Sequence, residues 1–141
     1  MRSSTSTVRR AFLLLLPIAA TAIGCGSRQA AQVSGRVTLN DQPLTTGTVT
    51  FHPADGQGAV AVGTIDQQGR FQISTGTDSG LAPGAYIVTV VATEAFQPTD
   101  PTAEVQYRDL APARYANVSE SELKTDVKAG PNDVPLALRS P

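Results

Sequence analysis

Residues 33–51 read VSGRVTLNDQPLTTGTVTF, and two runs within this stretch alternate between apolar and polar side chains. Val33, Gly35, Val37 and Leu39 occupy every second position of the first run, and residues 48–52 alternate in the same way. A period of two is typical of a β-strand with one buried face. The intervening residues 40–43, NDQP, form a cluster of turn formers. The stretch therefore predicts two strands separated by a turn.

The alternation continues along the rest of the chain. Further strands are expected at 59–65, 71–74, 86–92, 123–128 and 134–138. Residues 66–69, DQQG, suit a hairpin built on a type I turn, and YIVTVVA at 86–92 is apolar enough on both faces for a central strand. Seven short strands at regular spacing predict an all-β fold, a seven-stranded antiparallel β-sandwich. Residues 95–119 show no clear period and are expected to form a long loop.

The N-terminal residues have the three zones of a secretory signal. Basic residues Arg2, Arg9 and Arg10 precede an apolar run at 11–23, and small residues follow it. Thirteen apolar residues rise only about 20 Å as a helix, too short for a bilayer core of about 30 Å. We therefore expect a cleaved signal peptide over residues 1–24.

Cys25, the only cysteine, stands directly after that segment. Together with Ala22 and Gly24 it resembles the lipobox of bacterial lipoproteins, in which cleavage occurs just before a lipidated cysteine. Two or more acyl chains are enough for stable anchoring. We expect lipidation at Cys25, a tether at 25–31 and a folded domain at 32–141. The alternative is a secreted protein with a chance cysteine near its cleavage site.

The charge of the remaining chain excludes one class of partner. Three of the eleven basic residues lie before Cys25, so eight Lys and Arg face twelve Asp and Glu, a formal charge of −4. Without a basic patch, nucleic-acid binding is not expected. The expected partner is the membrane, through the N-terminal lipid. Gly26, where inner-membrane lipoproteins often have Asp, favours the outer membrane or cell surface over the inner membrane.

Three segments together resemble a known family. VSGRVTLNDQPLTTGTVTF (33–51), TIDQQGRFQI (64–73) and LAPGAYIVTVVA (81–92) occur in the order found in the carboxypeptidase regulatory-like domain. The tail at 112–139 is similar to that of short bacterial envelope lipoproteins built from this domain. The resemblance implies a transthyretin-like (prealbumin-like) Greek-key sandwich that serves as an accessory or adhesion-type module, because members of the family are mostly non-catalytic.

Few residues are of the types and in the patterns that indicate catalysis or metal binding. His52 is the only histidine and is expected on the outward face of a strand, exposed to solvent, so no metal site or cofactor is predicted. No serine lies in a G-x-S-x-G elbow, and the chain is not expected to be an enzyme. Four aspartates are expected in loops, where they are interpreted as turn formers rather than calcium ligands: Asp66, Asp78, Asp100 and Asp109.

Two functions remain as hypotheses. The first is a non-catalytic, membrane-anchored envelope lipoprotein whose sandwich has a structural or protein-interaction role, for instance through a free strand edge. The alternative is a surface carbohydrate-binding module. Its candidate ligand-binding residues lie in the 95–119 segment: Phe96, Tyr107, Arg108 and Tyr115. The same aromatic rings could instead pin a long loop onto the sandwich.

Overall fold

The structure, a computed structural model, describes residues 31–75, 78–100 and 102–141. The part of the chain described is all-β, as expected, and contains one short 3-10 helix, η1 (Ala113–Ala116). Its strands are β1 (Gln32–Leu39), β2 (Gln42–Pro43), β3 (Thr48–Pro53), β4 (Ala61–Thr64), β5 (Arg70–Gln72), β6 (Ser74–Thr75), β7 (Asp78–Ser79), β8 (Gly84–Val91), β9 (Thr93–Phe96), β10 (Gln106–Asp109), β11 (Lys124–Val127), β12 (Pro131–Asp133) and β13 (Leu136–Leu138).

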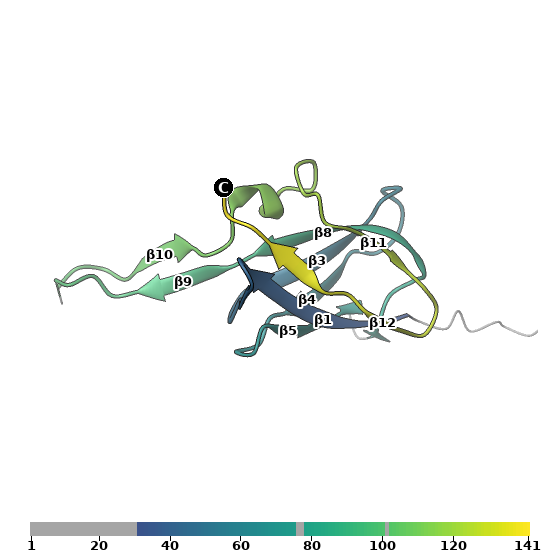
Figure 1. Cartoon of the computed structure of the whole chain (residues 1–141), viewed down its shortest axis with the longest axis horizontal. Helices are drawn as coiled ribbons and strands as arrows, with labels where there is room; N and C mark the ends of the chain where they lie inside the picture. The colour runs from purple at the N-terminus through teal and green to yellow at the C-terminus, as the bar shows by residue number, and fades with distance from the viewer. Residues whose placement is uncertain (1–30, 76–77, 101) are drawn as a thin grey trace, which may run out of the picture.

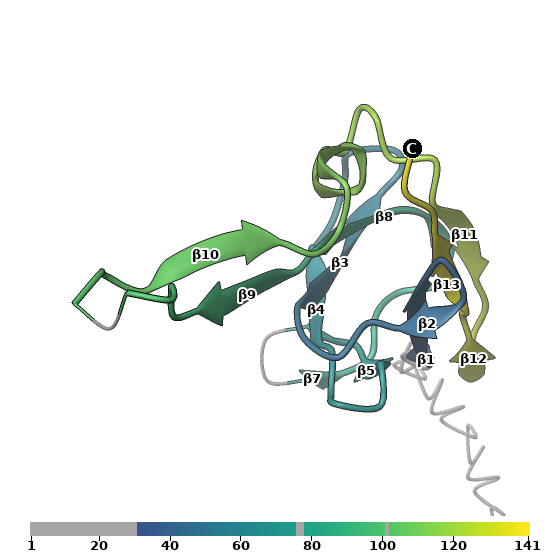
Figure 2. The same cartoon turned by 60° about the vertical axis from the view of Figure 1, so that its left-hand side comes forward.

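Two main sheets form the body of the molecule, which we define as the described residues other than 93–109. In one sheet β1 pairs with β2, β5, β12 and β13, and the other has the order β11-β8-β3-β4-β6-β7. Figure 2 shows β1 and β13 on one side of the body, with β3, β4 and β8 on the other. The expected central strand is confirmed, because β8 lies between β3 and β11.

One apolar core joins the two sheets. Val33 and Val37 of β1 are as fully buried as Val49 and Phe51 of β3 and as Val88 and Val90 of β8. The Phe51 ring lies 6.0 Å from the Tyr86 ring and 6.2 Å from the Phe71 ring, centroid to centroid. Each fully buried side chain of this kind stabilises the fold by about 1.5–3 kcal/mol. The alternation seen in the sequence therefore produces the buried faces of both sheets.

The turn at 66–69 forms, and the strand expected after it is divided between the two sheets. The Gly69 N–H donates to the Asp66 carbonyl at 2.9 Å, and Gly69 has a φ of 75°. Beyond the turn β5 pairs with β1, whereas Ser74 of β6 pairs antiparallel with Val62 of β4. The expected hairpin therefore forms only in part, because alternation alone does not show which sheet a strand joins.

The pairing of the C-terminal strands also differs from expectation. β12 and β13 both run parallel to β1, so the first sheet is mixed and not purely antiparallel. Gly35 permits this arrangement, because a Cβ there would lie 2.1 Å from the Val134 carbonyl oxygen. Strand direction depends on how the chain returns to the sheet, and the period of two is the same in either direction.

The described body includes Ala31, one residue before the expected domain boundary. Ala31 is fully buried, and it exchanges backbone hydrogen bonds with Leu81 at 2.7 and 2.9 Å. Ala31 therefore belongs to the sheet body and not to a tether. Cys25 and the expected signal peptide at 1–24 lie outside the described residues.

The segment at 95–119 is more ordered than the expected loop. It contains half of β9, all of β10 and the helix η1, and β9 and β10 form a separate two-stranded sheet. Figure 1 shows this pair projecting from one end of the body. A strand pair outside the core needs no alternation of buried and exposed residues, so its sequence carries no period-two signal.

Candidate functional site

The β9–β10 hairpin, residues 93–109, is the main candidate site. It continues the direction of β8 beyond the body, after a short break at Ala92. In its register Phe96 lies opposite Gln106, and Glu94 lies opposite Arg108. An isolated two-stranded hairpin is only marginally stable in water, so local side-chain contacts have to support this one.

One face of the hairpin holds a charged and aromatic cluster. Arg108 donates from Nε and Nη2 to Oε2 of Glu94 at 2.9 and 2.5 Å. Its guanidinium carbon also lies 5.7 Å from the centroid of the Phe96 ring. Exposed ion pairs contribute only about 0–1 kcal/mol, but this pair and the ring hold the two strands in register. Two of the predicted ligand residues, Phe96 and Arg108, thus contact each other.

The opposite face of the hairpin is open and holds two large apolar side chains. Tyr107 lies across from Ala95 and is 74% exposed. Val105, two positions earlier, shares this side in an extended chain and is 51% exposed. Tyr107 has the largest exposed fraction among the exposed large apolar side chains of the described residues. This ring is available to a partner.

The outer part of the hairpin is shaped by Asp100. Its Oδ1 accepts hydrogen bonds from the N–H and the hydroxyl of Thr102, and these bonds lower the pKa of the carboxyl. Asp66 similarly accepts from the backbone N–H groups of Gln68 and Arg70. Both aspartates are therefore turn formers, as predicted. Asp109 is not in a loop but in β10.

Tyr115 lies apart from the other candidate residues. It is the buried residue of η1, 5% exposed, so its ring is not open to a ligand. Its hydroxyl accepts hydrogen bonds from the Arg139 N–H at 3.1 Å and from Arg114 Nη2 at 3.2 Å. Burial alone would raise the pKa of Tyr115, but these donors outweigh it and hold the pKa below its usual value. Tyr115 pins the segment onto the body.

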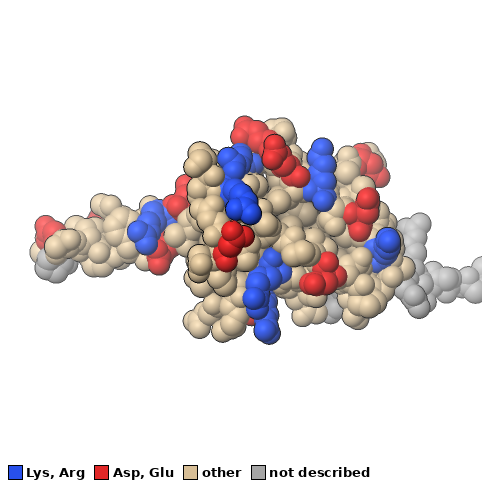
Figure 3. Space-filling model, in the orientation of Figure 1, with Lys and Arg blue, Asp and Glu red and all other residues tan. Residues whose placement is uncertain are grey.

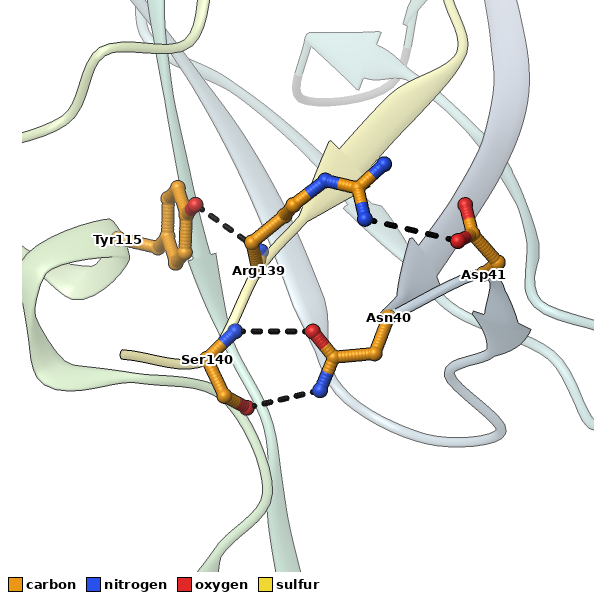
Figure 4. Close-up of polar contacts among 5 residues, drawn as sticks. All are labelled: Asn40, Asp41, Tyr115, Arg139 and Ser140. Carbon is orange, nitrogen blue, oxygen red and sulfur yellow. Dashed lines mark hydrogen bonds and ion pairs between the residues drawn. The ribbon is translucent and has the colours of Figure 1, made fainter.

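Tyr115 is part of a C-terminal clasp, which we define as Asn40, Asp41, Tyr115, Arg139 and Ser140 (Figure 4). Asn40 Nδ2 donates to Ser140 Oγ, and the Ser140 N–H donates to Asn40 Oδ1, both at 3.0 Å. Arg139 Nη1 lies 3.5 Å from Asp41 Oδ2. Asn40 and Asp41 have φ values of 48° and 68°, which Asn and Asp tolerate better than most residues. Sequence reasoning identified the turn but not its link to the chain end.

A second surface feature is a cleft of about 610 Å³ beside β1 and β5. Arg36 and Arg70 line it and lie directly opposite each other in the strand register. Asp66 and Asp133 line the same cleft, so the formal charges of its lining cancel. The balanced charge gives the cleft no clear preference for an anion or a cation.

His52 is less exposed than predicted. It is half-buried, and its Nε2 lies 3.0 Å from the hydroxyl oxygen of Thr89, a buried residue of β8. Within residues 31–75, 78–100 and 102–141, no group of three or more His, Cys, Asp or Glu side chains is placed to hold a metal ion. The described segments also include no helix that is long and apolar enough to span a membrane.

Comparison with known proteins gives little further information. No family model matches the chain, and no curated protein matches it. Among solved structures, a 9R-lipoxygenase from Cyanothece PCC8801 is similar over 80% of this chain, with 16% identity and a TM-score of 0.41. The chain spans only 17% of the length of that lipoxygenase. A similarity this distant bears neither on fold family nor on activity.

Proposed function

We propose that this chain is a non-catalytic envelope lipoprotein, anchored through Cys25, whose β-sandwich body presents the β9–β10 hairpin to a protein partner. The lipobox-like residues around Cys25 support the anchor. The exposed hairpin supports the interaction role. The proposal includes the transthyretin-like Greek key of the carboxypeptidase regulatory-like family and a position at the outer membrane or cell surface.

The position of the hairpin relative to Ala31 is the main support for the proposal. Ala31 pairs with Leu81, just before β8 begins, whereas β9 follows the other end of β8. An eight-residue strand spans about 26 Å. The hairpin and the start of the body therefore lie at opposite ends, as Figure 1 also shows.

This geometry has a consequence for an anchored protein. Five residues, 26–30, separate Cys25 from Ala31, and five residues reach at most about 18 Å. An anchor at Cys25 would hold the Ala31 end of the body close to the membrane surface. The hairpin would then point away from the membrane, toward partners in the surrounding compartment.

The carbohydrate-binding alternative has less support from the described surface. Sugar-binding sandwiches present flat aromatic rings, but Tyr115 is buried and the Arg108 guanidinium lies over the Phe96 ring. Tyr107 is the one candidate ring of the three that is both widely exposed and uncovered by a described cation. A glycan array with the Tyr107→Ala variant tests this alternative directly.

The anchor is tested by replacing Cys25 with Ser in a bacterial expression host. We expect the Cys25→Ser protein to move from the membrane fraction to the soluble fraction and to lose incorporation of labelled palmitate. A Ser27→Ala variant is the matched control and should behave as the parent. Membrane association that survives Cys25→Ser would overturn the lipid anchor.

A further inference from the structure

The backbone of β10 has one edge that pairs with β9 and one that is open. The Leu110 N–H donates to the Ala92 carbonyl at 2.8 Å, which makes residues 92 and 110 a hydrogen-bonded pair. Such pairs alternate along an antiparallel ladder, so Arg108 and Gln106 also direct their backbone groups toward β9. The N–H and C=O groups of Tyr107 and Asp109 consequently point to the opposite edge, where no strand pairs with β10 within the described residues.

The hairpin carries more acidic than basic side chains. Residues 93–110 contain four acidic side chains and one basic one, Arg108. Arg108 is already paired with Glu94 on the other face. Asp109, two positions after Tyr107, shares its side of the hairpin, and Glu104 lies just before β10. Both are exposed, and among the described residues neither has a basic residue within ion-pair distance. Figure 3, in which the hairpin projects at the left, shows acidic side chains along it.

We propose that the open edge of β10 binds an extended, basic peptide segment of a partner protein, which adds to the hairpin as a third strand. This inference rests on the proposed interaction role and names its partner class. The added strand would bond to the backbone of Tyr107 and Asp109, as in β-strand addition. A Lys or Arg of the partner would face Glu104 or Asp109. A second side chain of the partner, apolar or cationic, would cover the Tyr107 ring.

The acidic charge of the hairpin favours a basic peptide over a second copy of the chain at this edge. Two β10 edges in contact would bring together two hairpins that each have four acidic side chains and one basic side chain, and the like charges would repel. The Glu94–Arg108–Phe96 cluster holds the hairpin in its strand register before binding. A preformed edge reduces the entropy lost on association.

The test uses the full-length lipoprotein in detergent and a short synthetic peptide of alternating lysine and valine. We expect saturable binding, and protection of the Tyr107 and Asp109 amides from hydrogen exchange. Control peptides carry glutamate in place of lysine, or proline at alternate positions to remove N–H donors. Both should bind about tenfold more weakly or worse. Equal binding by the glutamate peptide, or protection confined to other amides, would overturn the proposal.

Protein variants locate the site. Tyr107→Ala and Asp109→Lys should each weaken binding of the lysine–valine peptide by about tenfold. The matched controls are Val60→Ala, an exposed apolar residue of the body, and Asp126→Lys on β11, an edge strand of the body; both should bind as the parent. Equal losses in the controls would contradict a site on β10.

If the open edge of β10 binds a second copy of the chain or a glycan instead of a basic peptide, the experiments give different results. Concentration-dependent dimerisation that Tyr107→Ala abolishes, without peptide binding, would assign the edge to a second copy. Binding of an oligosaccharide that perturbs Tyr107, without peptide binding, would assign it to a glycan. Either result overturns the peptide proposal. Because the anchor is scored separately by fractionation of Cys25→Ser, failure of peptide binding and failure of the anchor are distinguishable.

Discussion

The body and the hairpin both use antiparallel strand pairing, but different contacts hold them together. In the body, Phe51 and Val88 are fully buried between two sheets. In the hairpin, Tyr107 is mostly exposed, and the strands are held by the local contacts of Arg108 with Glu94 and Phe96. Burial of one large side chain is worth about 1.5–3 kcal/mol, whereas an exposed ion pair is worth about 0–1 kcal/mol. The stability of the body therefore rests on burial, whereas that of the hairpin rests on local surface contacts.

The largest expected effect is on the core of the body. Phe51→Ala removes the ring that contacts both Phe71 and Tyr86, and it leaves a cavity between the sheets. We expect the free energy of unfolding to fall by about 3–5 kcal/mol. Denaturant unfolding, followed by circular dichroism, measures the loss. Tyr107→Ala in the hairpin is the comparison and should change stability by less than about 0.5 kcal/mol. Similar losses for the two variants would contradict the separation of body and hairpin.

A smaller effect is expected at the C-terminal clasp, within the body. Asn40→Ala removes both side-chain hydrogen bonds to Ser140 and places a Cβ-bearing residue without a polar side chain at a φ of 48°. We expect a loss of about 1–2 kcal/mol. Asn40→Gly is the control, because it tolerates the backbone conformation and lacks only the side-chain bonds. It should lose less than Asn40→Ala; an equal loss would show that the backbone conformation contributes nothing.

The smallest expected effect on stability belongs to the hairpin. Glu94→Gln removes the ionic partner of Arg108 and should lower the global free energy of unfolding by less than about 0.5 kcal/mol. Hydrogen exchange at the Arg108 amide should nevertheless become faster, because opening of the hairpin does not require opening of the core. Exchange at the Val88 amide in the body serves as the internal control and should not change. Faster exchange at both amides would show that the hairpin and the body open together.

Most of the body was predictable because burial on one face leaves a pattern in the sequence. The alternation around Val33 and Val49 located β1 and β3, the apolar run at 86–92 located β8, and all three form as expected. The partners of these strands were not predictable in the same way. Leu136 belongs to a strand that runs parallel to β1, and residues 61–64 and 70–72 join different sheets although one turn connects them.

The candidate site was predictable only in part. Phe96, Tyr107 and Arg108 were grouped by their closeness in the sequence, and the hairpin does bring them onto one element. Tyr115 belonged to the same group on that ground, yet its ring is buried and its hydroxyl receives the Arg139 N–H. Whether an aromatic ring is exposed depends on which distant segments pack against it, and residue type does not reveal this.

An all-β fold and the positions of the main buried strands were predictable from residue order alone, because alternating side chains record which face of a strand meets the core. The sequence also predicted the turns at Asn40–Asp41 and Asp66–Gly69, because those residues favour the backbone conformations that the turns need. Three features depend on the three-dimensional packing of the chain: the parallel return of β13, the burial of Tyr115 and the open edge of β10. These features arise from contacts between residues far apart in the chain, or from the lack of such contacts, and neither leaves a local pattern.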